Sequence, residues 1–288
     1  MEWNKAKDII IVFLILLNIM LGIFLGINSR RYTLSMDQEK NIVEVLASNN
    51  ISMYCKIINK YEPMKMLELA PQTIDESKMV EAFLGTPNAI AGKDIDFKSY
   101  DYENKRLIIF ENKLIYENGD YLEQITLTNE SAIKLCQDYL NSMGTLGSGY
   151  ELDLGPYARG EELLLEYRQK INGTVIYDNN FLFAVDDYGI RRIEYSNNMP
   201  VGYSAGATEI CSSDEALFSF LQAMKRESAQ RPQRIVEKMD IVYLVDSAEP
   251  DTGRAYPYYR IYYTEVGDPD KLLRLCMVNA YLNTWRVL

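Results

Sequence analysis

The sequence predicts an α+β protein in which one apolar helix precedes helix-plus-antiparallel-meander units that form about two domains. Three observations support this fold class. They are a charge-free apolar run near the start, segments with the 3.6-residue helical period that follow capping residues, and segments whose apolar residues alternate. Strands grouped between helices favour α+β over a parallel α/β sheet. The 288 residues suffice for one large domain or two modest domains.

The composition excludes several classes of function. The chain carries 30 Lys and Arg against 41 Asp and Glu, a net charge of −11, so nucleic-acid binding is not expected. It has no His, which excludes Ser-His-Asp and Cys-His sites and His-ligated metals. No phosphate-binding glycine loop or G-x-S-x-G motif occurs. We expect no catalytic residue, cofactor or metal site; a glycosidase with two carboxylates far apart in sequence is an alternative.

The first element is an apolar helix over residues 9–27, which contain no charge. As a helix this run is about 28 Å long, close to the hydrocarbon thickness of a bilayer. The sequence therefore predicts a transmembrane anchor at 9–27 after a short tail at 1–8, with Trp3 at the membrane interface. A cleaved signal peptide is the alternative, although no A-x-A site follows the run. Basic residues flank both ends almost equally, so composition alone does not orient the helix.

Three residues of this helix suggest a contact with another membrane helix. Asn18, Gly22 and Gly26 are spaced by four, so they form one slowly drifting stripe. Two glycines at this spacing allow backbones to approach closely, and an Asn in lipid favours a polar partner. Because glycine is common in membrane helices, a chance spacing is the alternative.

The remainder divides into a first α+β region at 32–127 and a second at 128–288, which holds two helix-meander units. Capping boxes, in which a Ser or Thr is followed three residues later by Glu or Gln, open three of the predicted helices. A fourth helix is expected from about Thr128 to just before Gly144. The three boxes are Ser35 with Gln38, Thr73 with Glu76, and Ser212 with Glu215.

The strand segments lie at 98–127, 161–195 and 234–288, where the apolar period falls to two. Within the second segment, Asn172-Gly173 favours a type I′ hairpin. Four cysteines lie far apart and form no C-x-x-C pair, so we interpret them as buried thiols, with disulfides or metal ligands as alternatives. They are Cys55, Cys136, Cys211 and Cys276.

A tyrosine-rich strand at 255–264 is the clearest candidate surface of the globular part. Tyr258, Arg260 and Tyr262 alternate with its other residues, so they share one face. Aromatic residues and arginine are enriched at protein interfaces. We therefore predict partner binding by this face, with ordinary sheet packing as the alternative.

The start of the chain resembles the YycI (WalI) family, whose members are accessory proteins of the WalK/WalR (YycG/YycF) two-component system. The resemblance lies in residues 2–7, EWNKAK, followed directly by the apolar run and Asn18. The layout of one anchor and helix-plus-meander units that end in Val-Asn-Ala-Tyr at 278–281 is also similar. The residues after this strand, Leu-Asn-Thr-Trp at 282–285, differ from the aromatic, glycine-containing sequence with which members of that family end.

The resemblance implies a single-pass cell-membrane protein with a cytoplasmic N-terminus and an extracytoplasmic α+β portion. It implies a non-catalytic regulatory subunit that associates with a WalK-type sensor histidine kinase and a YycH-like protein and modulates control of cell-wall metabolism. The alternative is a membrane-tethered extracytoplasmic module, similar to a PepSY-type domain, that binds a peptide or glycan.

Overall fold

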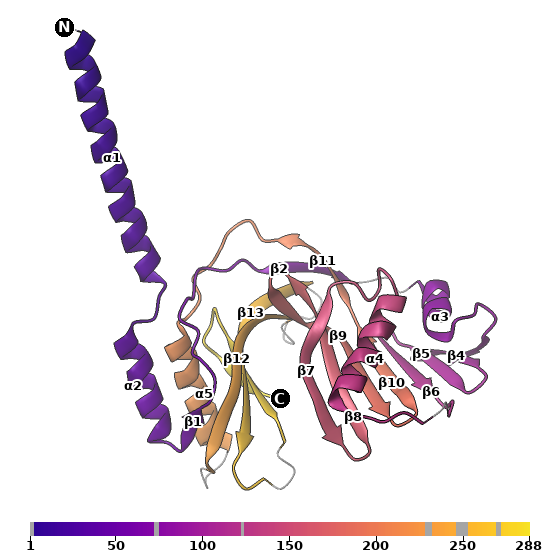
Figure 1. Ribbon diagram of the computed structural model, residues 1–288. Helices are drawn as coiled ribbons and strands as arrows, with labels where there is room; N and C mark the ends of the chain where they lie inside the picture. The colour runs from indigo at the N-terminus through magenta and orange to yellow at the C-terminus, as the bar shows by residue number, and fades with distance from the viewer. Residues whose placement is uncertain (1–2, 72–74, 122–123, 228–231, 246–252, 269–271) are drawn as a thin grey trace. The chain divides into compact units, whose positions relative to one another are not determined.

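The computed structural model describes residues 3–71, 75–121, 124–227, 232–245, 253–268 and 272–288. In these ranges the chain forms helices and mostly antiparallel strands, which confirms the predicted α+β class (Figure 1). The residues group into two compact units. Unit 1 comprises 1–64, 207–240 and 258–288, and unit 2 comprises 65–206 and 241–257.

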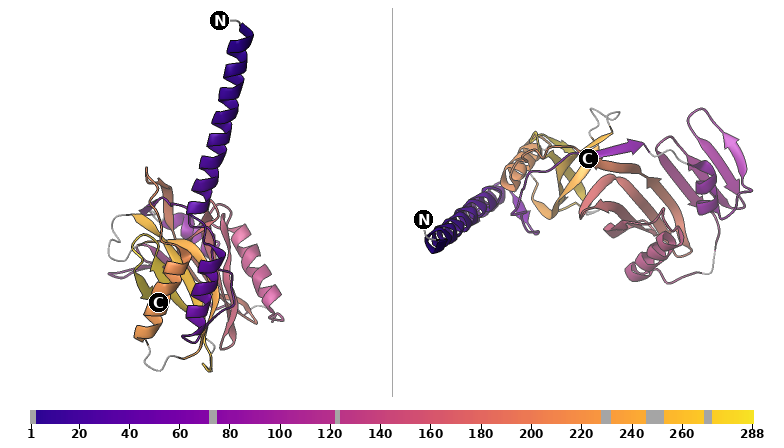
Figure 2. Two further views of the ribbon diagram at one scale, coloured as in Figure 1. Left: turned by 90° about the vertical axis from the view of Figure 1, so that its left-hand side faces the viewer. Right: turned by 90° about the horizontal axis from the view of Figure 1, so that it is seen from above.

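Unit 1 contains three helices and a small sheet. Strands β13 and β14 pair antiparallel with Tyr259 opposite Val278, whereas β1 and β12 pair parallel with Ser52 opposite Ile235. Helix α1 runs without interruption from Trp3 to Arg31 (Figure 2). The elements are α1 (Trp3–Arg31), α2 (Met36–Ala47), α5 (Ser213–Glu227), β1 (Ile51–Met53), β14 (Arg274–Asn279), β15 (Trp285–Val287) and most of β12 (Arg234–Val245) and β13 (Arg254–Glu265).

Unit 2 is built around an antiparallel sheet with the strand order β7-β8-β9-β10-β6-β5-β4-β3. The end of β12 pairs parallel with β9. The elements are β2 (Leu67–Pro71), α3 (Glu76–Leu84), β3 (Ile90–Lys93), β4 (Lys98–Tyr102), β5 (Lys105–Ile109), β6 (Lys113–Asn118), α4 (Asn129–Ser142), β7 (Tyr150–Arg159), β8 (Glu162–Ile171), β9 (Thr174–Asp186), β10 (Gly189–Ser196) and β11 (Asn198–Tyr203).

Local sequence signals account for most helix starts. The predicted capping box of Ser35 with Gln38 opens α2, and Thr128 caps α4. Helix α3 differs: its N-cap is Asp75, whose carboxylate accepts a hydrogen bond from the N–H of Lys78. The predicted cap at Thr73 lies outside the described residues. An aspartate immediately before the apolar stripe is as good an N-cap as a threonine, so the helix begins two residues later than the capping-box pattern predicts.

Both compact units are discontinuous in sequence, whereas the sequence boundary between 127 and 128 falls inside unit 2. Residues 65–206 lie in sequence between two parts of unit 1, and β12 and β13 each contribute one end to unit 1 and the other to unit 2. Residues on either side of position 127 belong together in unit 2 because β6 pairs with β10. Helix-meander periodicity identifies neighbouring strands along the chain but not strands that return to a distant partner. The parallel pairs of β12 with β1 and β9 are contacts of that kind.

Helices α3 and α4 cover one face of the unit 2 sheet, which we call the inner face, and bury an aromatic core there. Phe181 and Phe183 of β9 lie between Tyr139 of α4, Tyr150 of β7 and Tyr195 of β10. Ring centroids 4.4 to 6.0 Å apart are within the range in which aromatic pairs stabilise a core.

We expect Tyr139→Phe to leave the free energy of unfolding unchanged or to raise it by about 1 kcal/mol. The Tyr139 hydroxyl is buried without a hydrogen-bond partner, and burial raises its pKa, so its removal relieves a desolvation cost. The matched control is Tyr167→Phe. The Tyr167 hydroxyl donates to the carbonyl of Ile133 at 3.2 Å, so this change is expected to cost about 1 kcal/mol. Urea denaturation measures the free energy of unfolding of both variants. An equal decrease in the two variants would contradict the prediction.

Candidate functional site

The structure describes the side-chain positions of two of the three residues of the stripe predicted on α1, Asn18 and Gly22. The Asn18 amide donates to the carbonyl of Leu14 at 2.9 Å within the same helix. A Cβ added at Gly22 would lie within 4 Å of no atom outside the adjacent helix backbone. The side-chain position of Gly26 lies outside the described residues. Trp3 and the apolar side chains from Ile10 to Leu21 are exposed. In the part of the chain that the structure describes, no helix meets the length and hydropathy required of a membrane span.

The end of α1 is fastened to the rest of unit 1 by contacts at residues 31–34. Arg31 Nη2 lies 2.9 Å from Glu209 Oε1, and the Tyr32 hydroxyl donates to the same oxygen at 3.0 Å. The Tyr61 hydroxyl donates to the carbonyl of Arg31, and the Tyr61 N–H donates to that of Tyr32. The exposed ion pair adds little stability alone. Together with the backbone bonds it fixes the direction in which the chain leaves α1.

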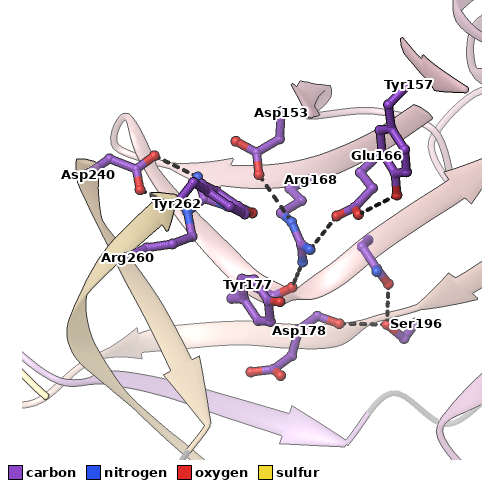
Figure 3. Close-up of polar contacts among 11 residues, drawn as sticks. Asp153, Tyr157, Glu166, Arg168, Tyr177, Asp178, Ser196, Asp240, Arg260 and Tyr262 are labelled. Atoms are coloured by element: carbon purple, nitrogen blue, oxygen red, sulfur yellow. Dashed lines mark hydrogen bonds and ion pairs between the residues drawn. The ribbon is translucent and has the colours of Figure 1, made fainter. Parts of the chain in front are cut away.

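The predicted exposed face of the tyrosine-rich strand is buried instead, which corrects the sequence expectation. Tyr258, Arg260 and Tyr262 of β13 are 5%, 0% and 4% exposed. Arg260 Nε and Nη2 bind the two carboxylate oxygens of Asp240 at 2.8 and 2.6 Å (Figure 3). The guanidinium also lies over the Tyr262 ring, 5.2 Å from its centroid. Alternation separates the two faces of a strand but does not show that both are covered.

A cavity of about 520 Å³ lies on the outer face of the unit 2 sheet, opposite α3 and α4, and sequence reasoning missed it. It is centred on β9 between β8 and β10. In the register of these strands Leu164, Ala184 and Arg192 form one row, in which the small Ala184 occupies the middle. The signal available in the sequence was the alternation in β8 to β10. The lining residues are Arg159, Glu162, Leu164, Leu182, Ala184, Arg192 and Glu194.

Charged side chains surround the apolar floor of this cavity. Glu194 contacts Lys113 of β6, and its other oxygen lies 3.0 Å from Arg192 Nη2. The Arg192 side chain remains 46% exposed. Arg159 is exposed where β7 meets β8, opposite Glu162. The lining therefore carries two cationic and two anionic side chains.

A second set of charged side chains in unit 2 is buried. These residues lie on β7 and β8, the strands that also contribute Arg159 and Glu162 to the cavity. The side chains of Arg168 and Asp153 are 5% and 4% exposed, and Arg168 Nε lies 3.1 Å from Asp153 Oδ2. Arg168 Nη2 donates to Glu166 at 2.6 Å, and Nη1 donates to the carbonyl of Tyr177 (Figure 3). The guanidinium stacks 3.9 Å from the Tyr177 ring centroid. Because Arg168 is enclosed by these groups, it supports the sheet and does not face a ligand.

The cysteines do not form a reactive site. All four are free thiols, and burial raises the pKa of Cys136, Cys211 and Cys276 to about 12. Thiols with such pKa values are not thiolate nucleophiles near neutral pH. Among the described residues, no three Cys, Asp or Glu side chains are grouped closely enough to hold a metal ion.

No protein-family model matches the chain, and no curated protein sequence is similar to it. Solved structures are similar in fold. An uncharacterized protein from Eubacterium rectale has a TM-score of 0.51 at 12% identity, with 83% of this chain and 90% of that chain covered. This likeness shows a shared fold only.

Two further solved structures have lower scores. The C-terminal domain of YpeB from Bacillus megaterium has a TM-score of 0.42 at 11% identity over 76% of this chain and 98% of that one. YycH from Bacillus subtilis has a TM-score of 0.49 at 13% identity over 72% of this chain and 50% of that one. The resemblance of the first residues to the YycI family stays a prediction.

Proposed function

We propose that this chain is a membrane-anchored, non-catalytic regulatory subunit that associates with a WalK-type sensor histidine kinase and a YycH-like protein. In this proposal residues 9–27 span the cell membrane, the N-terminus is cytoplasmic and both units are extracytoplasmic. The resemblance of residues 2–18 to the YycI family supports the partners. The observation that carries the proposal is the charge-free apolar α1, whose end is tied to unit 1 through Tyr61 and Glu209.

The mechanism follows from this connection. A helix that packs on a kinase helix through Asn18, Gly22 and Gly26 biases the kinase if it fits one signalling arrangement better than the other. The fastened junction after Arg31 would transmit a change in unit 1 to α1 instead of absorbing it in a flexible linker. Regulation then depends on the difference in free energy between the two packed states.

The test is co-purification of the kinase from native membranes in mild detergent with Gly22→Ile/Gly26→Ile. We expect the recovered kinase to fall roughly tenfold, since a close membrane-helix contact contributes about 1–2 kcal/mol. A Cβ added at Gly22 lies within 4 Å of no atom outside the adjacent helix backbone, so we expect the change to act mainly on the partner. The matched control is Leu16→Ile/Met20→Ile, on the opposite side of the helix because two residues advance about 200°.

The outcomes separate the possibilities. Equal recovery with both variants would contradict contact through the stripe and assign association to the globular units. If wild type at matched abundance recovers no kinase, the regulatory proposal fails. The tethered peptide- or glycan-binding module would then be the better function, and the outer-face cavity of unit 2 is the observation that favours it.

A further inference from the structure

Helices α2 and α5 lie side by side in unit 1, and a groove runs between them (Figures 1 and 2). We call it the α2–α5 groove. Its volume is about 280 Å³, far more than one water molecule occupies. The lining residues are Gln38, Asn41, Ile42 and Val45 of α2, and Asp214, Glu215 and Phe218 of α5.

The floor and walls of the groove are apolar. Ile42 is 5% exposed and lies at the floor, whereas Val45 and Phe218 remain 36% and 48% exposed. Phe218 is two residues from Phe220, whose buried ring packs on Tyr263 of β13. Because two residues advance about 200° around a helix, the two phenylalanine rings lie on opposite sides of α5. The Phe218 ring therefore points away from the core and is open to apolar side chains of a partner.

Both charged residues of the lining are acidic. Asp214 and Glu215 lie in the first turn of α5, and the remaining polar residues of the lining are uncharged amides. The Ser212 hydroxyl donates to Asp214 Oδ1, and the Ser212 N–H donates to Glu215 Oε2 at 2.9 Å. Within the described ranges, the second oxygen of each carboxylate has no hydrogen-bond or ion-pair partner. The α2–α5 groove therefore offers two carboxylate oxygens to a cationic group.

The acidic residues lie at one end of the groove. Helix α2 begins shortly after Arg31, and α5 begins shortly after Glu209, with which Arg31 pairs. First-turn residues of both helices, Gln38 of α2 and the two carboxylates of α5, therefore form the end of the groove next to α1. Val45 and Phe218 lie one to two turns further along their helices. The groove is thus acidic at the end next to α1 and apolar beyond it.

Two adjacent helices form a groove of the kind that a third helix fills. Gln38 and Val45 are seven positions apart on α2, which corresponds to about 10 Å or two helical turns. An amphipathic helix places its side chains at i, i+3, i+4 and i+7 into such a groove. A Lys or Arg at one end of that helix would reach Asp214 and Glu215, and apolar side chains one and two turns away would cover Phe218.

We propose that the α2–α5 groove binds an amphipathic helix of a partner protein, with a basic residue at the end next to α1 and apolar residues beyond it. Charge complementarity selects this occupant. A second copy of this chain carries a net charge of −11, and an anionic lipid headgroup is repelled by the same carboxylates. The site lies outside α1, so it does not depend on helix association through Asn18, Gly22 and Gly26.

The experiment measures binding of fluorescein-labelled peptides to the full chain in phosphatidylcholine nanodiscs by fluorescence anisotropy, with empty nanodiscs as background. The probes are AKKALAQLLAQLAQA, whose leucines follow the i, i+3, i+4, i+7 pattern, and the charge-reversed AEEALAQLLAQLAQA. We expect the lysine peptide to bind at least about tenfold more tightly at low salt. This preference should shrink as salt rises, because the carboxylates are open to solvent.

Two variants test the two parts of the site. Phe218→Gln removes the apolar wall and should weaken binding of the lysine peptide about tenfold. Asp214→Asn/Glu215→Gln should abolish the preference for the lysine peptide, since no carboxylate remains in the lining. Both variants are expected to fold. Phe218 is 48% exposed, and the amide oxygens of Asn and Gln can still accept the hydrogen bonds of Ser212.

Each variant has a matched control. Val43→Gln replaces an exposed apolar side chain of α2 that does not line the groove, so binding should be unchanged. Glu130→Gln/Asp138→Asn removes the same two kinds of acid from exposed positions of α4 in unit 2. It changes the net charge as much as Asp214→Asn/Glu215→Gln does, and the preference for the lysine peptide should persist.

Three results would overturn the proposal. The first is equal or absent binding of the two peptides by the wild-type chain. The second is a control variant that changes binding as much as its matched groove variant, which would show unspecific attraction to an acidic chain. The third is a dimer in analytical ultracentrifugation that Phe218→Gln dissociates, because the groove would then be filled by a second copy.

Discussion

Replacing Arg168 with alanine is expected to lower the free energy of unfolding by about 3–5 kcal/mol. The change removes the ion pair of Arg168 with Asp153 and leaves a carboxylate in a site where its side chain is only 4% exposed. Glu166 loses its 2.6 Å partner and keeps the hydroxyl of Tyr157. The carbonyl of Tyr177 also loses a hydrogen bond from the guanidinium, and the Tyr177 ring loses its cation–π contact. Removing one partner of a buried ion pair is among the most costly defects that a single substitution can create.

Two measurements check the effect. Urea denaturation gives the free energy of unfolding, and hydrogen exchange should show lost protection in β8 and β9. The control is Arg106→Ala, whose pair with Asp101 is about half exposed and is expected to contribute about 0–1 kcal/mol. Arg168→Met/Asp153→Leu should recover part of the loss, because it removes both charges together. If Arg168→Ala lowered the free energy of unfolding no more than Arg106→Ala does, the prediction would be wrong, and solvent would have to reach the Arg168–Asp153 pair.

Local parts of the fold follow from the sequence because their causes are local. Ser35 and Thr128 cap helices where the capping pattern predicts them, and Gly85 ends α3 in the left-handed conformation. Asn172 and Gly173 both have positive φ, as a type I′ hairpin requires. Each signal acts within a few residues, so no tertiary information is needed to read it.

Contacts between distant segments could not be read in this way. The pairing of β12 with β1 and with β9 joins segments far apart in sequence, and alternation is the same for every possible partner. The cavity likewise depends on how strands pair and not on a local sequence signal. Ala184 is unremarkable in the sequence, and it forms a hollow only because the register places it between Leu164 and Arg192.

Arg260 shows how a residue of an interface type can be part of a core. Arginine on a tyrosine-rich strand fits a binding surface, and it equally fits a buried bidentate pair with a carboxylate. The carboxylate is Asp240, twenty residues earlier on β12, and nothing in the spacing identifies it as the partner.

Arg260→Ala is accordingly expected to destabilise unit 1 by about 3 kcal/mol, at the lower end of the cost of breaking a buried pair. The lower end applies because the Asp240 side chain is 30% exposed and Lys238 lies 3.7 Å away. Arg260→Lys should recover less than half of the loss, since an ammonium cannot reproduce two parallel hydrogen bonds. Lys238→Ala is the control and should change stability little, because that ion pair is solvated.

The same variants distinguish a structural role of Arg260 from the partner contact that its sequence context suggests. Denaturation with urea measures stability, and kinase recovery at matched amounts of folded protein measures association. Reduced stability with unchanged recovery is the expected result, because a guanidinium with no exposed surface cannot meet a partner without displacing its own chain. Wild-type stability of Arg260→Ala with lost recovery would require β13 to open on binding, and the strand would then be the interface that its tyrosines and arginine suggested.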